Sequence, residues 1–401
     1  MSSTVSSSKV GFSFRDLPVA CKLLLALSFI EAIGGGLSYH IAYFFSVSTN
    51  FNKLNIGFLG FAMGIGAILG SICGGYVTGK AQAKDIIGTS FLLIGVAFVI
   101  LAKVSSFHLS VAFVFLMGFG INLFITCSNS SFLQISRKTN HSLTIAQSYK
   151  NALENTGGIV AMVLIMLLAQ NHFKLAMILV GVTLIVFSTV IFIKLEISND
   201  DVVATTSNKE EIETIYSSLI PMLFSVFCIG LTYGIQKTVL GIHLNETIGS
   251  SLVIGFFFAT DPILIALFQV KLSKRIEGFN KHAVACIGCI LLGASTFSMG
   301  LSTTILGMFC SLLVFTLGEM LFMAYSVALC HQYGSSNHSG LGIGAWRSAY
   351  ALGMMIGPLI SGIAMYYFNA QSAWTISSLL CFMSAFLVFN SKRERRLEAV
   401  Y

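Results

Sequence analysis

The chain has 401 residues, of which 55% are hydrophobic and only 10% are Asp, Glu, Lys or Arg. A soluble domain carries about 25% charged residues, so this composition cannot cover a chain of this length with a water-facing surface. Soluble globular, disordered, fibrous and nucleic-acid-binding proteins are therefore excluded despite the formal net charge of +7, and a polytopic α-helical membrane protein is predicted.

Twelve apolar stretches follow one another along the chain, each about as long as the 20 residues that a helix needs to cross a bilayer. They cover 18–46, 55–78, 86–103, 109–130, 146–170, 174–194, 215–238, 248–270, 282–301, 304–329, 341–367 and 372–390. The first stretch is longer than the apolar core of a signal peptide, about 7–15 residues, so we expect it to be retained as a helix.

The polar and acidic segment from Glu196 to Glu213 separates six stretches from six. We therefore expect an N-terminal six-helix bundle at 1–194, a cytoplasmic acidic linker at 195–214 and a C-terminal six-helix bundle at 215–401. Short motifs recur between the two halves at nearly the same separation. The segment Gly36–Tyr39 is similar to Gly230–Tyr233, and Gly120–Phe124 is similar to Gly318–Phe322. Such a repeat predicts two pseudo-symmetric bundles with the substrate site between them.

Lys and Arg are distributed unevenly between the two sides of the predicted membrane protein. With the N-terminus in the cytoplasm, all but four of the 23 basic residues lie in cytoplasmic segments or the adjoining helix ends. The four exceptions are Lys53, Lys103, Lys174 and Lys237. Because cytoplasmic loops collect basic residues, we expect both termini in the cytoplasm. We also expect the protein in the inner (plasma) membrane of a bacterium.

The loop after the second stretch carries a recognisable pattern. Its sequence from Gly75 to Lys84 resembles the signature of the major facilitator superfamily, roughly Gly-x-x-x-Asp-Arg-x-Gly-Arg-Arg. The first glycine and the basic residues Lys80 and Lys84 are kept, whereas Gly79 stands where the family has the acid. The resemblance extends over essentially the whole chain and implies that Gly75, Lys80 and Lys84 form a gating loop. The missing acid puts the charge-pair role of that loop in doubt.

A second pattern lies in the eleventh stretch, where Gly353, Gly357 and Pro358 are followed by Gly362. It resembles the Gly-x-x-x-Gly-Pro-x-x-Gly-Gly element of antiporters in this superfamily, although that element is diagnostic in the fifth helix. Close helix packing and a kink explain the same residues without any role in export. The nearest resemblance is to twelve-helix drug:proton antiporters, a group that includes exporters of small metabolites such as siderophores.

Four acids lie within apolar stretches, namely Glu31, Glu154, Asp261 and Glu319. A charge near the bilayer centre costs about 2.5–3.5 kcal/mol, so such acids usually face a cavity or a partner. Loss of solvation favours the protonated form of a carboxyl group, and these acids are therefore candidates for proton coupling. The alternative is structural pairing. Lys150 lies one turn before Glu154, and Asp261 precedes a proline and fits a polar cap at a kink.

The candidate substrate-binding residues are polar groups at similar depths, namely Tyr39, His40, Asn122, Tyr233, Gln236 and Arg347. Hydrogen bonds between helices are the alternative for each of them. Arg347 also fits a pair with Glu319, an anionic substrate, or the lipid headgroups. Lys237 has the same ambiguity near the outer end of its stretch.

No cofactor or metal is expected. The segment Gly74–Lys80 fits the G-x-x-x-x-G-K nucleotide-binding loop, but Ala81 replaces the required Ser or Thr and the segment ends a membrane helix. The nine cysteines lie in or beside apolar stretches and are interpreted as packing residues.

These observations predict a secondary active transporter of a small organic molecule, not an enzyme, with an all-α major facilitator fold of twelve helices. Proton-coupled efflux of a drug or small metabolite is the first expectation. Proton-coupled uptake of a nutrient or metal chelate is the alternative, and a non-transporting receptor or a membrane enzyme is the third. The expected partners are the substrate, protons and the lipid bilayer, with no nucleic acid, and the chain is expected to act as a monomer.

Overall fold

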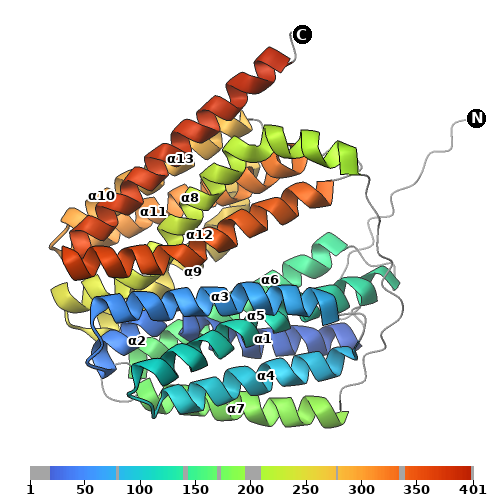
Figure 1. Ribbon diagram of the computed structural model, residues 1–401, viewed down its shortest axis with the longest axis vertical. Helices are drawn as coiled ribbons and strands as arrows, with labels where there is room; N and C mark the ends of the chain where they lie inside the picture. The colour runs from blue at the N-terminus through green and yellow to red at the C-terminus, as the bar shows by residue number, and fades with distance from the viewer. Residues whose placement is uncertain are drawn as a thin grey trace, which may run out of the picture.

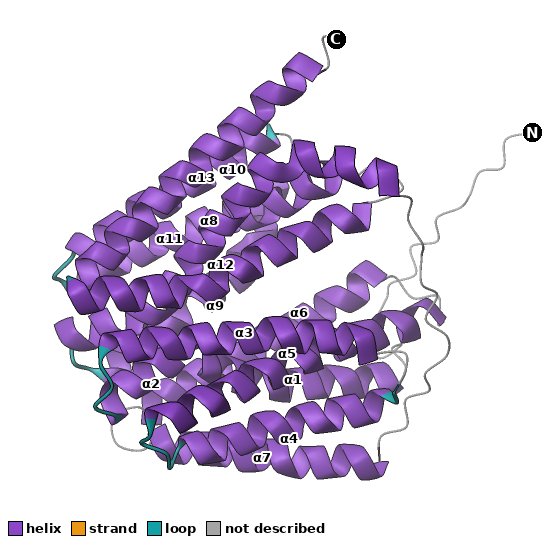
Figure 2. Ribbon diagram, viewed as in Figure 1, coloured by secondary structure: helices purple, strands orange, loops and turns teal. Residues whose placement is uncertain are grey.

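A computed structural model describes residues 19–77, 81–138, 143–168, 173–194, 209–276, 279–333 and 339–398. All regular elements in these ranges are helices (Figure 2), as expected in lipid, where each backbone polar group must be satisfied within its own segment. The helices are α1 (Val19–Tyr39), α2 (Ile41–Ser48), α3 (Lys53–Val77), α4 (Ala83–Leu101), α5 (Phe107–Lys138), α6 (Leu143–Leu168), α7 (Phe173–Lys194), α8 (Lys209–Thr247), α9 (Ser251–Arg275), α10 (Lys281–Leu301), α11 (Ile305–Tyr333), α12 (Ser339–Tyr367) and α13 (Ala370–Glu398).

The predicted fold class is confirmed, with twelve apolar stretches giving thirteen helices because the first stretch is divided. α1 ends at Tyr39, His40 leaves helical geometry with φ −106° and ψ 19°, and α2 starts at Ile41. Among the described residues, eleven helices are long and apolar enough to cross a membrane, and α6 contributes a shorter apolar stretch, Leu153–Ile165.

The seventh stretch was bounded incorrectly. α8 runs from Lys209 to Thr247 instead of 215–238, so it begins inside the expected acidic linker and ends well beyond Lys237. Residues 195–208 of that linker lie outside the described residues. The polar residues that suggested an end at 238 are compatible with helix because this part of α8 faces the interior, as the site below shows.

Two bundles are visible in Figure 1, with α1–α7 in the lower one and α8–α13 in the upper one. The short repeated motifs make equivalent contacts in each. A Cβ atom added at Gly36 of α1 would meet Ala161 and Gly158 of α6, and one added at Gly230 of α8 would meet Tyr350 and Gly353 of α12. The helix pairs α1–α6 and α8–α12 therefore approach closely at matching positions.

The second pair of motifs behaves in the same way. A Cβ atom at Gly120 of α5 would lie 3.2 Å from the carbonyl oxygen of Ser90 in α4, and one at Gly318 of α11 would lie 2.9 Å from that of Gly288 in α10. The repeat found in the sequence therefore corresponds to a repeated packing scheme.

The two bundles meet along α3 and α12, and along α6 and α9. The first of these contacts is built from small residues that let the backbones approach. A Cβ atom at Gly57 would lie 2.6 Å from the Pro358 carbonyl oxygen and 2.7 Å from the Gly362 Cα atom. Gly353 and Gly357 face the other way and pack on α8, where a Cβ atom at Gly357 would lie 2.5 Å from the Leu231 carbonyl oxygen. Pro358 lies within a continuous α12.

The helices define two ends of the molecule. We name the end where α3 meets α4 and α9 meets α10 the basic end. Its described cationic side chains are Lys22, Lys84, Lys271, Arg275 and Lys281. The other end, where α2 meets α3 and α8 meets α9, is the opposite end. Between the two ends the helices present large apolar side chains outward, as Leu306 at 72% exposure and Phe386 at 64% illustrate, in keeping with a lipid-facing surface.

Candidate functional site

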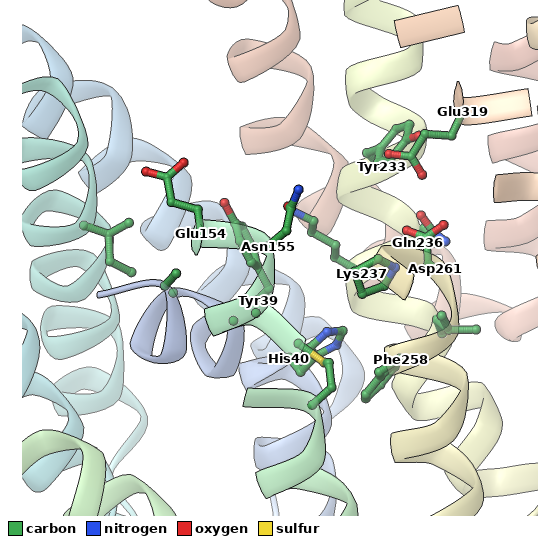
Figure 3. A pocket seen from close by; sticks show the side chains of 18 of the residues that line it. Tyr39, His40, Glu154, Asn155, Tyr233, Gln236, Lys237, Phe258, Asp261 and Glu319 are labelled. Atoms are coloured by element: carbon green, nitrogen blue, oxygen red, sulfur yellow. The ribbon is translucent and has the colours of Figure 1, made fainter. Parts of the chain in front are cut away.

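A cavity of about 420 Å³ lies between the two bundles. Its walls come from α1, α5 and α6 of the first bundle and from α8, α9, α11 and α12 of the second (Figure 3). The polar side chains that line it are Glu31, Tyr39, His40, Glu154, Asn155, Tyr233, Gln236, Lys237, Asp261, Glu319 and Tyr350. A cavity of this size and composition, with aromatic walls and a few convergent polar groups, is typical of a small-molecule site.

Most of the predicted site residues meet in this one cavity, including all four acids. Tyr39, His40, Tyr233 and Gln236 lie there too, and Tyr39 and Tyr233 enter it from opposite bundles, as their matching positions in the repeat suggested.

Two predicted substrate-binding residues do not line the cavity. On α5 the cavity is faced by Ile121 and Ile125, four residues apart on one side of the helix, so Asn122 points elsewhere and its side-chain nitrogen donates to the Gly118 carbonyl oxygen at 3.1 Å. Arg347 is exposed, one turn before Tyr350 of α12 and nearer the basic end.

The expected gating loop lies at the basic end, apart from the cavity lining. Gly75 is exposed near the end of α3, with no atom within 4 Å of an added Cβ atom, and Lys84 is half-buried in the first turn of α4. Lys80 and Gly79 lie outside the described residues.

Asn155 and Tyr350 line the cavity but are absent from the predicted set, and Lys237, which the sequence left between substrate binding, pairing and the lipid headgroups, lines it as well. Asn155 adjoins Glu154, and Tyr350 follows Arg347 by one turn, so helical spacing from the predicted residues was the available signal. Lys237 was assigned to the outer end of a stretch that in fact continues for almost three more turns.

The first bundle holds a cluster of carboxyl groups around Glu31. Glu154 accepts a hydrogen bond from Lys150 Nζ at 2.7 Å, which confirms the ion pair expected from their spacing. Lys150 is 1% exposed and also donates to Asn129 Oδ1. Glu31 is 4% exposed, and its Oε1 atom has no hydrogen-bond partner in the described part of the chain.

The charges that act on Glu31 are those of Glu154 and Lys150. Because Lys150 is already paired with Glu154, it compensates only one of the two carboxylates. A buried carboxylate oxygen without a hydrogen-bond donor is costly, and such an acid usually faces a cavity or a partner.

The second bundle holds another cluster of acids, from two helices. Asp261 of α9 accepts a hydrogen bond from Thr316 of α11 at 2.6 Å, and α9 continues without a break through Pro262. This contact is a structural partner of the kind considered for Asp261, but it is not a helix cap. Glu319 lies beside Tyr233 (Figure 3), and its Oε2 atom makes no hydrogen bond to any described residue.

Contacts between the bundles close the cavity on the side of the opposite end. The His40 ring stacks on Phe258 of α9 with 3.7 Å between ring centroids, and Lys237 Nζ lies 3.5 Å from the centroid of the Tyr39 ring. Both contacts depend on the break between α1 and α2, because it turns Tyr39 and His40 toward the second bundle.

Beyond them, Lys53 Nζ of α3 lies 2.7 Å from Glu246 Oε1 of α8, so an ion pair joins the bundles at the opposite end. Both side chains are partly exposed, and such pairs contribute up to about 1 kcal/mol. We expect Glu246→Gln to leave the melting temperature nearly unchanged but to shift the protein toward states open at this end. Spin labels at Asn52 and Thr247, with exposed Cys310 replaced by Ser, measure the separation.

The matched control is the charge exchange, Lys53→Glu combined with Glu246→Lys, which restores the attraction and is expected to restore the short distance. High salt should act like Glu246→Gln because it screens exposed charges. An unchanged distance distribution in Glu246→Gln would show that the ion pair does not hold this end closed.

A polar cavity between two bundles of membrane-crossing helices, closed at one end by contacts between those bundles, defines a membrane transporter. The family agrees. The chain matches the Major Facilitator Superfamily over residues 24–220 and 222–399, and it therefore belongs to that superfamily. Its members are transporters, so the chain is a transporter and not an enzyme.

Solved structures with the same fold belong to transporters of different compounds. The chain is similar to the nucleoside transporter NupG, with 14% identity, a TM-score of 0.76, and coverage of 94% of this chain and 99% of that one. It is also similar to a bacterial homolog of the human lysosomal transporter Spinster in an inward-facing and unoccupied conformation, with 12% identity, a TM-score of 0.74, and coverage of 93% and 96%.

An auto-inhibited POT family peptide transporter gives 12% identity and a TM-score of 0.73 over 94% of this chain and 97% of that one. At these identities the similarity concerns the fold alone. No curated protein sequence matches the chain.

Proposed function

We propose that this transporter exchanges protons for a small organic molecule with a positively charged group, and that it exports a drug or small metabolite in this way. The observation that carries the proposal is Glu31, a buried carboxyl group with an unpartnered oxygen in the same cavity as the aromatic side chains. A proton and a cationic substrate both neutralise this group.

Competition for one group makes the two ligands mutually exclusive, and mutual exclusion is what exchange requires. If each ligand also has a different affinity for the two conformations, its binding shifts the equilibrium between them. Protonation of Glu31, together with Asp261, Glu319 or Glu154, then releases the substrate on one side of the membrane, and deprotonation allows rebinding on the other.

The orientation of the protein in the membrane is proposed from the charge distribution. We place the basic end and both termini in the cytoplasm, because cytoplasmic segments collect Lys and Arg, and we place the protein in a bacterial plasma membrane. The contacts of His40, Lys237 and Lys53 then seal the outer side, as in the state from which an exporter takes substrate, and an importer passes through the same state when it releases substrate. We also propose that the transporter acts as a monomer.

Proton-coupled uptake is the second candidate, and Lys237 is the observation that favours it. An anion held by Lys237 binds together with protons on Asp261 and Glu319, because those protons remove the negative charges that repel it. Joint binding produces symport in place of exchange.

The test compares the small molecules inside and outside cells that have or lack the protein. Export predicts accumulation inside cells without it, whereas depletion inside those cells would contradict export. The identified compound is then added outside proteoliposomes that contain the protein and a pH-sensitive dye. Antiport makes the lumen more alkaline as protons leave, symport makes it more acidic, and an unchanged pH contradicts proton coupling.

A further inference from the structure

Lys237 is a cavity lysine that the exchange mechanism does not use. It lies four residues after Tyr233 on α8, and both side chains therefore face the cavity (Figure 3). Its ammonium group reaches across to the first bundle, where it lies over the Tyr39 ring at 3.5 Å from the centroid.

The partners of Lys237 differ from those of the other lysine in this region. Lys150 is bound by the Glu154 carboxylate and the Asn129 amide oxygen, which makes it a structural counter-ion. Within the described residues Lys237 forms no ion pair, although Asp261 and Glu319 lie within electrostatic range. The ammonium group of Lys237 is therefore available to an anionic group of a ligand.

The contact of Lys237 with Tyr39 is weak enough to be replaced by a contact with a ligand. A cation over an aromatic ring gains about 0.5–1 kcal/mol when exposed and about 2 kcal/mol when desolvated. Hydrogen bonds between an ammonium and an anionic group are stronger, and an ammonium has three N–H donors. An anionic group that enters the cavity is therefore a better partner for Lys237 than the ring.

The rest of the lining restricts what else the ligand carries. Four carboxyl groups face the same cavity, namely Glu31, Glu154, Asp261 and Glu319, against the single cavity lysine. A purely anionic ligand is repelled by those that are ionised, and a purely cationic ligand leaves Lys237 with the Tyr39 ring but without an anionic partner. A ligand with both charges satisfies both parts of the lining.

We propose that Lys237 binds the anionic group of the transported molecule, and that this molecule is a small zwitterion whose positive group lies among the cavity carboxyl groups. The inference rests on the proposed function in taking this cavity as the transport site. It does not depend on the direction of transport or on proton coupling.

The test measures binding to the purified, detergent-solubilised protein by calorimetry, without any pH gradient. Three probes share one phenyl group and chain: phenylalanine carries both charges, 2-phenylethylamine only the positive one, and 3-phenylpropionate only the negative one. The aromatic lining formed by Tyr39, Phe257, Phe258 and Tyr350 suits this common part. The wild-type protein is expected to bind phenylalanine most tightly.

Lys237→Met keeps the apolar stem and removes the charge. We expect it to weaken phenylalanine binding by at least about 30-fold, the effect of truncating one partner of a buried charge pair. Binding of 2-phenylethylamine should change by less than about threefold because it lacks the group that Lys237 holds. Lys237→Arg keeps the charge and should retain most of the preference for phenylalanine. Lys103→Met, at an exposed lysine of the opposite end, is the control and should change neither affinity.

Equal loss of all probes in Lys237→Met would assign Lys237 a structural role and overturn the proposal. Unchanged phenylalanine binding in that variant, or no preference for phenylalanine in the wild-type protein, would overturn it as well. The results that contradict the proposed function differ from those that contradict this inference. Lys237-dependent binding of a zwitterion without proton movement contradicts only the exchange mechanism, whereas proton exchange for a substrate without an anionic group contradicts only this inference.

Discussion

Glu31→Gln is expected to abolish proton-driven transport and to weaken exchange of substrate across the membrane, because it removes the carboxylate for which protons and the substrate compete. Glutamine resembles a permanently protonated Glu31, because it fills the same space without titrating. When one proton is exchanged per molecule, a gradient of one pH unit sustains about a tenfold ratio between the substrate concentrations on the two sides of the membrane. In the variant we expect equal concentrations on both sides. Proteoliposomes with an imposed pH gradient measure that ratio, and counterflow of labelled substrate measures exchange.

Asp85→Asn is the matched control, because Asp85 is an exposed acid in the first turn of α4 and lies outside the cavity lining. It should keep the full ratio. If Glu31→Gln sustained the same substrate ratio as the wild-type protein, Glu31 would not carry the coupling, and Asp261 and Glu319 would become the candidates.

Gly57→Leu is expected to remove transport by separating the two bundles where α3 crosses α12. Its Cβ atom would lie 2.6 Å from the Pro358 carbonyl oxygen, and neither backbone can yield without moving a whole helix. Overpacking of this kind typically costs about 1–3 kcal/mol, and the expected melting temperature is at least about 3 °C lower. Thermal unfolding in detergent and the initial rate of transport measure the two effects.

Gly344→Leu is the control on the partner helix α12, because no atom lies within 4 Å of an added Cβ atom there. It should leave both measurements close to the wild-type values. A Gly57→Leu protein with normal stability and transport would contradict the close contact between α3 and α12.

Helix positions were largely predictable, because a membrane-crossing helix must be apolar over a length that the bilayer sets. Several helices run beyond the predicted ends of their apolar stretches, namely α5 to Lys138, α8 to Thr247 and α13 to Glu398. α8 was ended too early since its second part carries Gln236 and Lys237, which face the cavity instead of lipid. The break at His40 was missed because the residues on both sides of it are apolar enough for one continuous helix.

The resemblance to the major facilitator superfamily implied a transporter, whereas composition and the order of apolar stretches by themselves determined a membrane protein with twelve apolar stretches and acids within four of them. Charge content and segment length suffice for this, because both are read residue by residue. Only the tertiary structure decided that Glu31, Glu154, Asp261 and Glu319 share one cavity with Lys237. These residues come from five helices in two bundles, and which faces of those helices meet depends on close contacts such as that of Gly57 with Pro358, which no single segment encodes. The same packing left Asn122 and Arg347 outside the cavity, although their depth and polarity matched those of the residues inside.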